Sequence, residues 1–301
     1  MELRQLRVFI KAAETLNFSE GAKALFMTQS SFSQNIKQLE EELKIQLFYR
    51  NSHEVTLTEA GKELLPYARS TIQQSDNCVN LMNDLNNLQC GTLDIGVTHS
   101  FSQISVVTIA EFMKAYPAIK LNVIYKTMGE LFDLLMQHKL DFVLSYKPLC
   151  SLPQIESHIL FEDHLSVIVN QNHPLAKERK VKLDDLHKFP LALPAKGLQA
   201  RNALDRILEE NRVTLDARVE LNQVTPLLRM VRKYQIATVL SSTAVNLDPD
   251  LKSIPIDSPH CEMEGSFHML KDAYRKASAK EFIRMLMDTD EVRQLRGKWL
   301  L

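Results

Sequence analysis

Residues 28–43 read TQSSFSQNIKQLEEEL, and their apolar side chains recur at the spacing of one helical face. Successive members are four, three and four positions apart, which predicts a single buried stripe on an α-helix. Thr28 is a good N-cap, so the helix is expected to begin directly after it. The opposite face carries amides, hydroxyls and a lysine, and the N-terminal half should therefore be polar and exposed. The apolar stripe consists of Phe32, Ile36, Leu39 and Leu43.

Two shorter helices are expected before this segment. The first carries one apolar stripe and ends near Leu16. The second follows Ser19, which is a suitable N-cap, and is ended by a tight turn at residues 26–28. The stripe of the first helix consists of Leu6, Phe9, Ile10 and Ala13.

A helix start rich in Gln and Ser suits the major groove of DNA. Amides can bond an adenine edge in bidentate fashion, and hydroxyls can reach phosphates. The alternative is a solvated face on a small helical domain, and the polar pattern alone gives both interpretations equal weight. Two short helices joined by a tight turn favour a helix-turn-helix. Residues 47–50 and 55–57 then predict two short strands around a loop, which together form a wing.

Net charge gives no support to DNA binding. The chain has 36 Lys and Arg against 37 Asp and Glu, a formal net charge of −1. Its first 65 residues hold eight basic and nine acidic side chains. Because no uniformly positive field is present, DNA binding must depend on the face on which the cations lie.

The composition is typical of a soluble globular protein, with 45% hydrophobic and 24% charged residues. A length of 301 residues predicts two or three structural units. No stretch approaches the roughly 18 apolar residues of a membrane span, and the N-terminus lacks the apolar core of a secretory signal. We therefore expect a cytoplasmic protein with no membrane partner. No metal or cofactor is expected, because no cysteine has metal-ligand spacing. The cysteines are Cys78, Cys90, Cys150 and Cys261.

An enzyme is not expected, because the sequence has no phosphate-binding glycine loop, no GxSxG elbow and no metal motif. Accordingly, we expect no catalytic residues. The better alternative is a cytoplasmic solute-binding module, since residues 92–301 alone would fit it. That alternative leaves the first 60 residues and the helix after them unexplained.

A long helix is expected after the wing. Thr58 can cap a helix that begins at Glu59, and nothing stops it before Cys90 and Gly91. One row of residues recurs at alternating spacings of three and four, which is a heptad seam against which a second chain should pack. The alternative is that this row packs on the C-terminal part of the same chain. The seam consists of Leu65, Ala68, Ile72, Ser75, Val79 and Met82.

From residue 92 onward, expected strands and helices alternate, which predicts a parallel sheet covered by helices on both faces. A second unit of the same kind begins near Phe161, and the chain returns to the first unit near Gly265. The first unit has strands at 93–97, 121–125 and 142–144 and helices at 104–115 and 131–137. The second has extended segments at 165–169, 191–192, 219–221 and 237–240, a helix through 201–211, and a last helix follows at 282–287.

The N-terminal motif resembles that of LysR-type transcriptional regulators. The resemblance rests on Met27 to Ile36 together with Leu39-Glu40, Leu47-Phe48, Arg50 and Leu57 to Gly61. It implies a sequence-specific DNA-binding regulator that responds to a small-molecule effector. The family would place Gln29, Ser33 and Gln34 near bases, Lys37 and Arg50 near the DNA backbone, and the His53 loop at the minor groove. The DNA-binding candidates are Thr28, Gln29, Ser30, Ser31, Ser33, Gln34, Lys37, Arg50 and His53.

This sequence departs from the family pattern at several positions of the DNA-binding motif. Ser30 stands where proline is usual, and Gln34 where arginine is common. Lys44 and Gln46 replace a usual glycine and a frequent proline. The missing cation at Gln34 bears on the strength of DNA binding and on base preference.

The remaining two-thirds resembles the effector domain of the same family, which has a two-lobed periplasmic-binding-protein fold. The matching segments are 91–96, 140–142, 173–176 and 183–186. The resemblance implies a homodimer, commonly a homotetramer, that binds promoter DNA, with RNA polymerase as a further candidate partner. The expected domains are a winged helix-turn-helix at 1–58, a linker helix at 59–90 and an effector domain at 91–301. Lobe I would comprise 91–161 and 266–301, and lobe II 162–265.

In such folds, ligands bind at the carboxyl ends of strands, beside helix N-termini whose free amides favour anions. Hydroxyls, amides and backbone donors follow several of the expected strands and suit a small carboxylate or a similar polar anion. A helix cap is the alternative role for each of these residues taken singly. The effector-binding candidates are Thr98, His99, Ser100, Thr127, Met128, Ser145, Lys196, Gln199, Gln223, Thr225 and Ser241.

Overall fold

The computed structural model describes residues 1–50, 55–85, 91–148, 150, 152–245, 248–271 and 273–297. Two compact units divide the chain, Met1–Asn86 and Asn87–Leu301. Two of the expectations lie outside the described residues: the position of His53 and the end of the long helix at 86–90. Within the described residues, no helix is long and apolar enough to cross a membrane.

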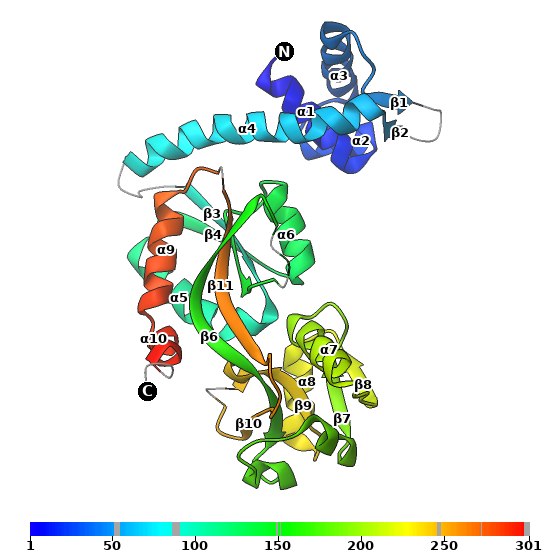
Figure 1. Ribbon diagram of the computed structural model, residues 1–301. Coiled ribbons are helices and arrows are strands. Elements are labelled where there is room, and N and C mark those ends of the chain that lie inside the picture. The colour runs from blue at the N-terminus through cyan, green and yellow to red at the C-terminus, as the bar shows by residue number, and fades with distance from the viewer. Residues whose placement is uncertain are drawn as a thin grey trace. The chain divides into compact units, whose positions relative to one another are not determined.

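The first unit is a winged helix-turn-helix followed by a long helix (Figure 1). Its core is aromatic: Phe18 meets Phe32 and Phe48 at ring-centroid distances of 5.7 and 5.5 Å, and Phe9 meets Phe48 at 5.6 Å. The two wing strands pair antiparallel. The elements are α1 (Leu3–Thr15), α2 (Phe18–Ala24), α3 (Gln29–Leu43), β1 (Phe48–Arg50), β2 (Val55–Leu57) and α4 (Glu59–Leu85).

Helix starts follow the capping rules, with one correction. Thr28 caps α3 as expected, since its hydroxyl accepts the Ser31 N–H at 3.2 Å. The cap expected at Ser19 is wrong: Asn17 caps α2, because its Oδ1 accepts the N–H of Ser19 at 2.9 Å and that of Glu20 at 3.2 Å. An Asn side chain two residues earlier competes successfully for the same orphan amides.

The apolar stripe of α3 is confirmed at three of its four positions. Phe32, Ile36 and Leu39 are fully buried, whereas Leu43 is 37% exposed. The helix ends there, because Lys44 takes the left-handed conformation. The stripe therefore leaves the core in the last turn.

The expected seam on α4 is wrong in its first half. Ala68 and Ile72 are buried in the core of the helix-turn-helix unit, and Leu65 packs against that core. Ion pairs join Arg7 to Asp76 and Arg69 to Glu14, so α1 lies along this face of α4. The apolar row predicted a buried face correctly but not the partner that covers it.

The second unit begins with the expected βαβαβ arrangement. Strands β4, β3 and β5 are parallel neighbours, and α5 and α6 provide the crossovers. Strand β11 adds to β5 antiparallel, and α9 and α10 complete this lobe, which we call lobe I. Its elements are β3 (Gly91–Val97), α5 (Ser102–Ala115), β4 (Ile119–Tyr125), α6 (Met128–Met136), β5 (Phe142–Tyr146), α9 (Ala277–Asp288) and α10 (Asp290–Gly297).

Two long strands run from lobe I into the other lobe (Figure 1). They are β6 (Ile155–Asn170) and β11 (Glu262–Leu270), which pair antiparallel from Ile155 to His164 of β6. Beyond this point, β6 pairs with β9 and β10. Strand β6 therefore starts ten residues earlier than expected, because its first half is too polar to show an apolar run.

Lobe II carries the second α/β set. Helix α8 and strand β10 were not expected, although Val224, Leu227, Leu228 and Val231 recur at helical spacing in α8. Three short 3-10 helices cover residues 174–177, 183–188 and 242–245. The elements are β7 (Leu191–Pro194), α7 (Gln199–Asn211), β8 (Ala217–Leu221), α8 (Val224–Lys233), β9 (Thr238–Ser241) and β10 (Leu251–Pro255).

Candidate functional site

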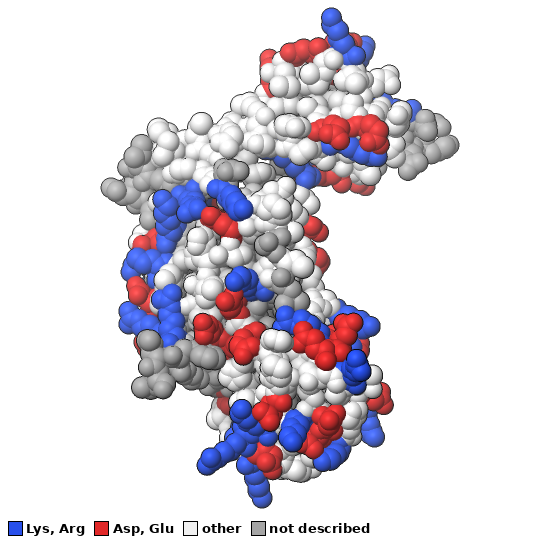
Figure 2. Space-filling view, in the orientation of Figure 1, with Lys and Arg blue, Asp and Glu red and all other residues white. Residues whose placement is uncertain are grey.

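The polar face of α3 is exposed as the sequence predicts. Gln29, Ser30, Gln34 and Lys37 are exposed, while the flanking serines at 31 and 33 are half-buried. The fully buried Phe32 and Ile36 anchor the helix from behind. On the face that Figure 2 shows, acidic and basic side chains of this unit are interspersed and form no continuous field. The face can therefore offer amides, hydroxyls and one cation to a polar surface.

A glycine allows α2 and α3 to cross closely. A Cβ placed on Gly21 would lie 2.7 Å from Cζ of Phe32, which is closer than real Cβ contacts. Phe32 is fully buried, so a shift of its ring would disturb the surrounding core. The orientation of the recognition helix thus depends on the absence of a side chain at position 21.

Arg50 does not offer a free cation at the wing. Its guanidinium bonds the Glu40 carboxylate at 2.5 Å and lies 5.1 Å above the Phe18 ring centroid. The other Glu40 oxygen accepts the N–H groups of Leu47 and Phe48. In this structure the charge of Arg50 holds the wing onto α3, and the expected contact of Arg50 with the DNA backbone stays a prediction.

Phe26 was not among the predicted site residues, although it lies beside the polar face. It occupies the turn before α3, is 99% exposed and has a left-handed φ of 53°. A fully exposed phenylalanine in a strained turn is unusual for a purely structural residue. No sequence pattern singled out Phe26, because the turn at residues 26–28 was expected without a role for its side chains.

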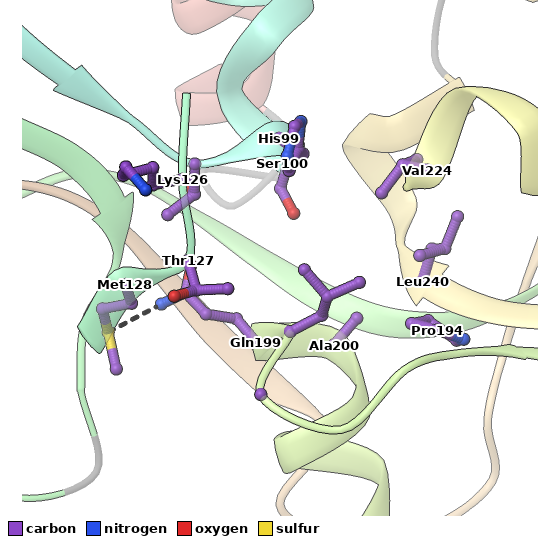
Figure 3. Close-up of a pocket in the computed structure, with 13 residues that line it drawn as sticks. His99, Ser100, Lys126, Thr127, Met128, Pro194, Gln199, Ala200, Val224 and Leu240 are labelled. Carbon is purple, nitrogen blue, oxygen red and sulfur yellow. Dashed lines mark hydrogen bonds between the residues drawn. The ribbon is translucent and has the colours of Figure 1, made fainter. Parts of the chain in front are cut away.

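The second candidate site is a cleft between lobes I and II, at the carboxyl ends of the strands (Figure 3). Lobe I contributes the segments that follow β3 and β4, and lobe II contributes the start of α7 with Pro194, Val224 and Leu240. The cavity measures about 10 Å³, which is room for about one water molecule. Six predicted residues line it: Thr98, His99, Ser100, Thr127, Met128 and Gln199.

Thr225 lines an adjoining cavity of about 370 Å³, which shares His99 and Ser100 with the cleft. Residues of α5 and α8 line this second cavity. The two cavities adjoin at His99 and Ser100 and together make up one cleft.

Gln199 joins the two lobes. Its Nε2 donates to the Tyr146 carbonyl at 2.7 Å and to Sδ of Met128 at 3.1 Å, the contact dashed in Figure 3. Its Oε1 accepts the Tyr146 N–H at 3.2 Å. The first residue of α7 in lobe II is thereby bound to the last residue of β5 in lobe I.

The hydroxyl of Thr127 is already engaged. It donates to Oε2 of Glu130 at 2.7 Å, and the same oxygen accepts the Thr127 N–H, so the two residues form a capping box at the start of α6. Hydrogen bonds from Lys126 and Thr127 lower the pKa of Glu130 to about 2. Thr127 contributes to the cleft mainly as part of its wall.

Ser145 was wrongly placed in the cleft. It is fully buried, and its Oγ bonds Nε2 of His268 at 2.9 Å. Successive strand residues alternate between faces, so the residue that reaches the lobe junction is Tyr146 rather than Ser145. Burial lowers the pKa of His268 to about 4, which keeps the imidazole neutral between the hydroxyls of Ser145 and Ser157.

Three further predicted residues are not brought to the cleft. Lys196 and Gln223 are exposed and line neither of its cavities. Ser241 is buried, and its hydroxyl bonds that of Thr243 at 3.2 Å. All three lie at or just after strand ends as expected, but none of them lines the cleft.

The sequence reasoning missed a buried carboxylate at the lobe junction. Asp163 of β6 is 2% exposed and accepts hydrogen bonds from Tyr146 Oη at 2.6 Å, Ser242 Oγ at 2.5 Å and Thr243 Oγ1 at 2.8 Å. It also accepts the N–H groups of His164 and Thr243. Burial and the nearby Asp163 raise the pKa of Tyr146 well above its ordinary value, so the phenol remains a donor. No short motif reveals this cluster.

Comparisons with known proteins match both units. Residues 3–62 match the family described as bacterial regulatory helix-turn-helix protein, lysR family, and residues 86–291 match the LysR substrate binding domain. The HTH-type transcriptional activator CmpR of Synechocystis sp. is 29% identical over 220 residues, which cover 73% of this chain and 72% of CmpR. The HTH-type transcriptional regulator SoxR of Arthrobacter sp. is 31% identical over 207 residues, 68% of either chain.

Solved structures share the fold. A variant of full-length OxyR from Pseudomonas aeruginosa aligns with a TM-score of 0.72 at 20% identity, over 98% of this chain and 95% of that chain. Full-length CbnR complexed with its target DNA aligns with a TM-score of 0.54 at 19% identity, over 95% and 98%. The regulatory domain of Synechocystis CcmR in complex with 2-PG aligns with a TM-score of 0.59 at 18% identity, over 65% and 96%.

A DNA-binding helix-turn-helix joined to a two-lobed binding domain defines a class of ligand-responsive regulators. Both family matches then identify the chain as a member of the LysR family of transcriptional regulators, which are not enzymes.

Proposed function

We propose that this LysR-family protein recognises specific sites in double-stranded promoter DNA through the polar face of α3. The observation that carries the proposal is that Gln29 and Gln34 expose their amides while Phe32 and Ile36 fix the helix from behind. Amides in this position suit adenine edges in the major groove. CbnR, which has the same fold, has been solved with its target DNA.

The test is selection of bound fragments from random duplex DNA by the full-length protein near physiological salt, where non-specific phosphate attraction is weak. We expect enrichment of a two-fold symmetric sequence. Folded protein that enriches no sequence, with or without small anions, would contradict the proposal.

We further propose that the protein acts as a homodimer, or as a tetramer of two dimers, through an exposed stripe on α4. This stripe differs from the seam that the sequence predicts. Its residues are spaced four, three, four and three positions apart and all are exposed, as a coiled-coil seam requires before its partner binds. The stripe consists of Tyr67, Thr71, Gln74, Cys78 and Leu81.

Light scattering on purified protein tests this seam. Tyr67 is 71% exposed, so Tyr67→Glu should not disturb the fold but should place charge in the dimer contact. We expect this variant to dissociate at concentrations at which the parent chain remains dimeric. Lys62→Gln, also on α4 but outside the stripe, is the matched control and should leave the dimer intact.

The cleft between the lobes is proposed as the effector site, with a small polar anion as its ligand. Ser100 and His99 line both cavities of the cleft, and residues of the first turns of α5 and α7 line them as well, so two helix N-termini lie at the cleft. CcmR, which shares the fold, has been solved with 2-PG. Because the smaller cavity measures about 10 Å³, a ligand larger than a water molecule can occupy it only if the two lobes turn relative to each other.

Calorimetric titration of the full chain with small carboxylates and phosphates, each paired with its neutral amide or alcohol, tests this preference. We expect heat only from the anions. A neutral analogue that binds as tightly as its anion would contradict an anionic effector.

Effector binding would alter the angle between lobes I and II and thereby change how the paired heads bend promoter DNA. DNA bending measured with and without an anion that binds should differ. Identical bending and protection for every anion that demonstrably binds would count against this mechanism.

A further inference from the structure

A second and larger cavity lies between α6 and α7, on another side of the Gln199 bridge from the effector cleft. Its volume is about 720 Å³, within the roughly 300–1,000 Å³ of typical small-molecule pockets. Lobe I contributes α6 and the segment after β5, and lobe II contributes α7. The start of β11 forms the remaining wall. We call it the α6–α7 pocket.

The wall of this pocket is apolar and polarisable. Phe132 and Met263 are buried, 4% and 8% exposed, and Met128 is half-buried. Met136 and Leu152 also line the pocket. Methionine side chains adapt to irregular apolar ligands and make favourable contacts with aromatic rings. The shape and the lining suit a ligand of aromatic size with an apolar body.

Charge at the rim disfavours an anion. The pocket lining includes Asp133, Glu262 and Glu264 against Lys147 and Arg206. Lys147 is neutralised by Glu264 at 2.5 Å. Among the residues that the structure describes, no ion pair is formed by Asp133 or Glu262. Arg206 pairs with Glu210, at 3.9 Å, and the three acidic and two basic side chains of the lining leave a formal charge of −1. A ligand with a negative charge is disfavoured by this balance.

We propose that the α6–α7 pocket is a second small-molecule site, which takes an uncharged aromatic ligand and is separate from the polar effector cleft. Gln199, Met128 and Tyr146 belong to the lining of this pocket. Met128 and Gln199 also line the effector cleft. A ligand in the second pocket therefore contacts the same side chains that hold the two lobes together. The proposal does not depend on the identity of the effector or on DNA binding.

The first test uses two dyes with the same ring system. N-phenylnaphthylamine is uncharged, whereas anilinonaphthalene sulfonate carries a sulfonate. Fluorescence titration of the full chain should give a Kd for the uncharged dye at least about tenfold lower than for the sulfonate. Equal or tighter binding of the sulfonate would overturn the proposed ligand class.

Gly129 offers a way to fill the pocket. It lines the cavity on α6, and a Cβ at this position meets no atom within 4 Å, so the side chain of Gly129→Leu would start in open space. We expect this variant to weaken binding of the uncharged dye about tenfold or more. Ala110→Leu on the exposed face of α5 is the matched control and should bind the dye like the parent chain.

A charge variant keeps the test decisive if Gly129→Leu unfolds the protein. Asp133 and Glu262 are exposed, so Asp133→Asn combined with Glu262→Gln should fold normally. We expect the double variant to bind the sulfonate several-fold more tightly and the uncharged dye unchanged. No change in sulfonate binding would show that the dye binds elsewhere.

A cysteine reports occupancy directly. Cys150 is exposed and lines the pocket. Saturation with the uncharged dye should slow alkylation of Cys150 by iodoacetamide, measured on its peptide by mass spectrometry, and the Gly129→Leu variant should show no such slowing. Unchanged alkylation of Cys150 in the parent chain would place the dye outside the α6–α7 pocket and overturn the proposal.

Discussion

The side chain of Gln199 forms a two-point contact with the main chain of Tyr146: Nε2 donates to the carbonyl at 2.7 Å, and Oε1 accepts the N–H at 3.2 Å. The contact joins the start of α7 in lobe II to the end of β5 in lobe I. The Tyr146 hydroxyl bonds Asp163 and Thr243. Tyr146 is therefore held at the lobe junction through both its main chain and its hydroxyl.

Gln199→Ala removes this contact. We expect the free energy of unfolding of the effector unit to fall by about 1–3 kcal/mol, because the N–H and carbonyl of Tyr146 lose their partner in a largely buried place. Denaturant unfolding followed by circular dichroism measures the change. Lys196→Ala, three residues earlier and exposed, should leave the midpoint unchanged.

Asp163→Asn tests the buried cluster. The hydroxyls can rotate to suit an amide, but the two N–H groups cannot, so an NH₂ in the wrong place leaves a donor facing a donor. We expect a loss of about 1–3 kcal/mol in unfolding free energy. Tyr146→Phe removes only one of the donors and should cost about 1 kcal/mol. An Asp163→Asn variant as stable as the parent chain would show that the carboxylate charge contributes nothing.

Gly21→Ala separates helix propensity from packing. Alanine is favoured over glycine by about 1 kcal/mol within a helix. Here the added Cβ meets Phe32 at 2.7 Å in a closed core, and overpacking costs about 1–3 kcal/mol. We expect the variant to be less stable by thermal unfolding and to bind DNA more weakly. A gain in stability would mean that Phe32 has room to move.

Gln29→Ala tests base recognition. We expect selected sites to be bound about 1–3 kcal/mol more weakly, with little change on random duplex DNA. Gln38→Ala, exposed on the same helix but further from its N-terminus, should bind both kinds of DNA like the parent chain. Equal losses on all DNA from Gln29→Ala would remove Gln29 from base readout.

His268 predicts the pH dependence of stability. Its pKa is lowered by burial from 6.5 to about 4, so the unfolded chain binds a proton that the folded chain rejects. The neutral imidazole contributes at most about 3 kcal/mol to the free energy of unfolding. This contribution is complete above the pKa of the unfolded chain and is lost as pH falls towards the pKa of the folded chain. Unfolding midpoints between pH 7.5 and 5 measure it. His268→Gln should flatten the slope, and an unchanged slope would assign it to other groups.

Local signals in the sequence predicted local structure well. Thr28 caps α3 because its partner lies three residues away, and Phe32 with Ile36 marks a buried face through spacing alone. The six cleft residues follow from where strands end. These inferences depend on interactions within a few residues of chain.

The wrong predictions concern which part of the molecule packs against a residue. The row that includes Ala68 and Ile72 is apolar whether α1 or another chain covers it, so spacing could not choose the partner. Ser145 and Tyr146 are neighbours on one strand, and they differ in which face of the sheet their side chains occupy. Asp163 bonds Tyr146 and Thr243, which lie 17 and 80 residues away in the sequence. No short sequence motif covers such separations.

The pair of strands β6 and β11 determines what kind of motion the effector unit can make. Both crossings between the lobes are hydrogen-bonded to each other, so they form a ribbon rather than two independent tethers. A ribbon of this kind resists stretching, because lengthening it would break ladder hydrogen bonds, but it yields to changes in twist. We therefore expect a ligand in the cleft to rotate one lobe slightly about the ribbon relative to the other lobe, and not to open the lobes widely.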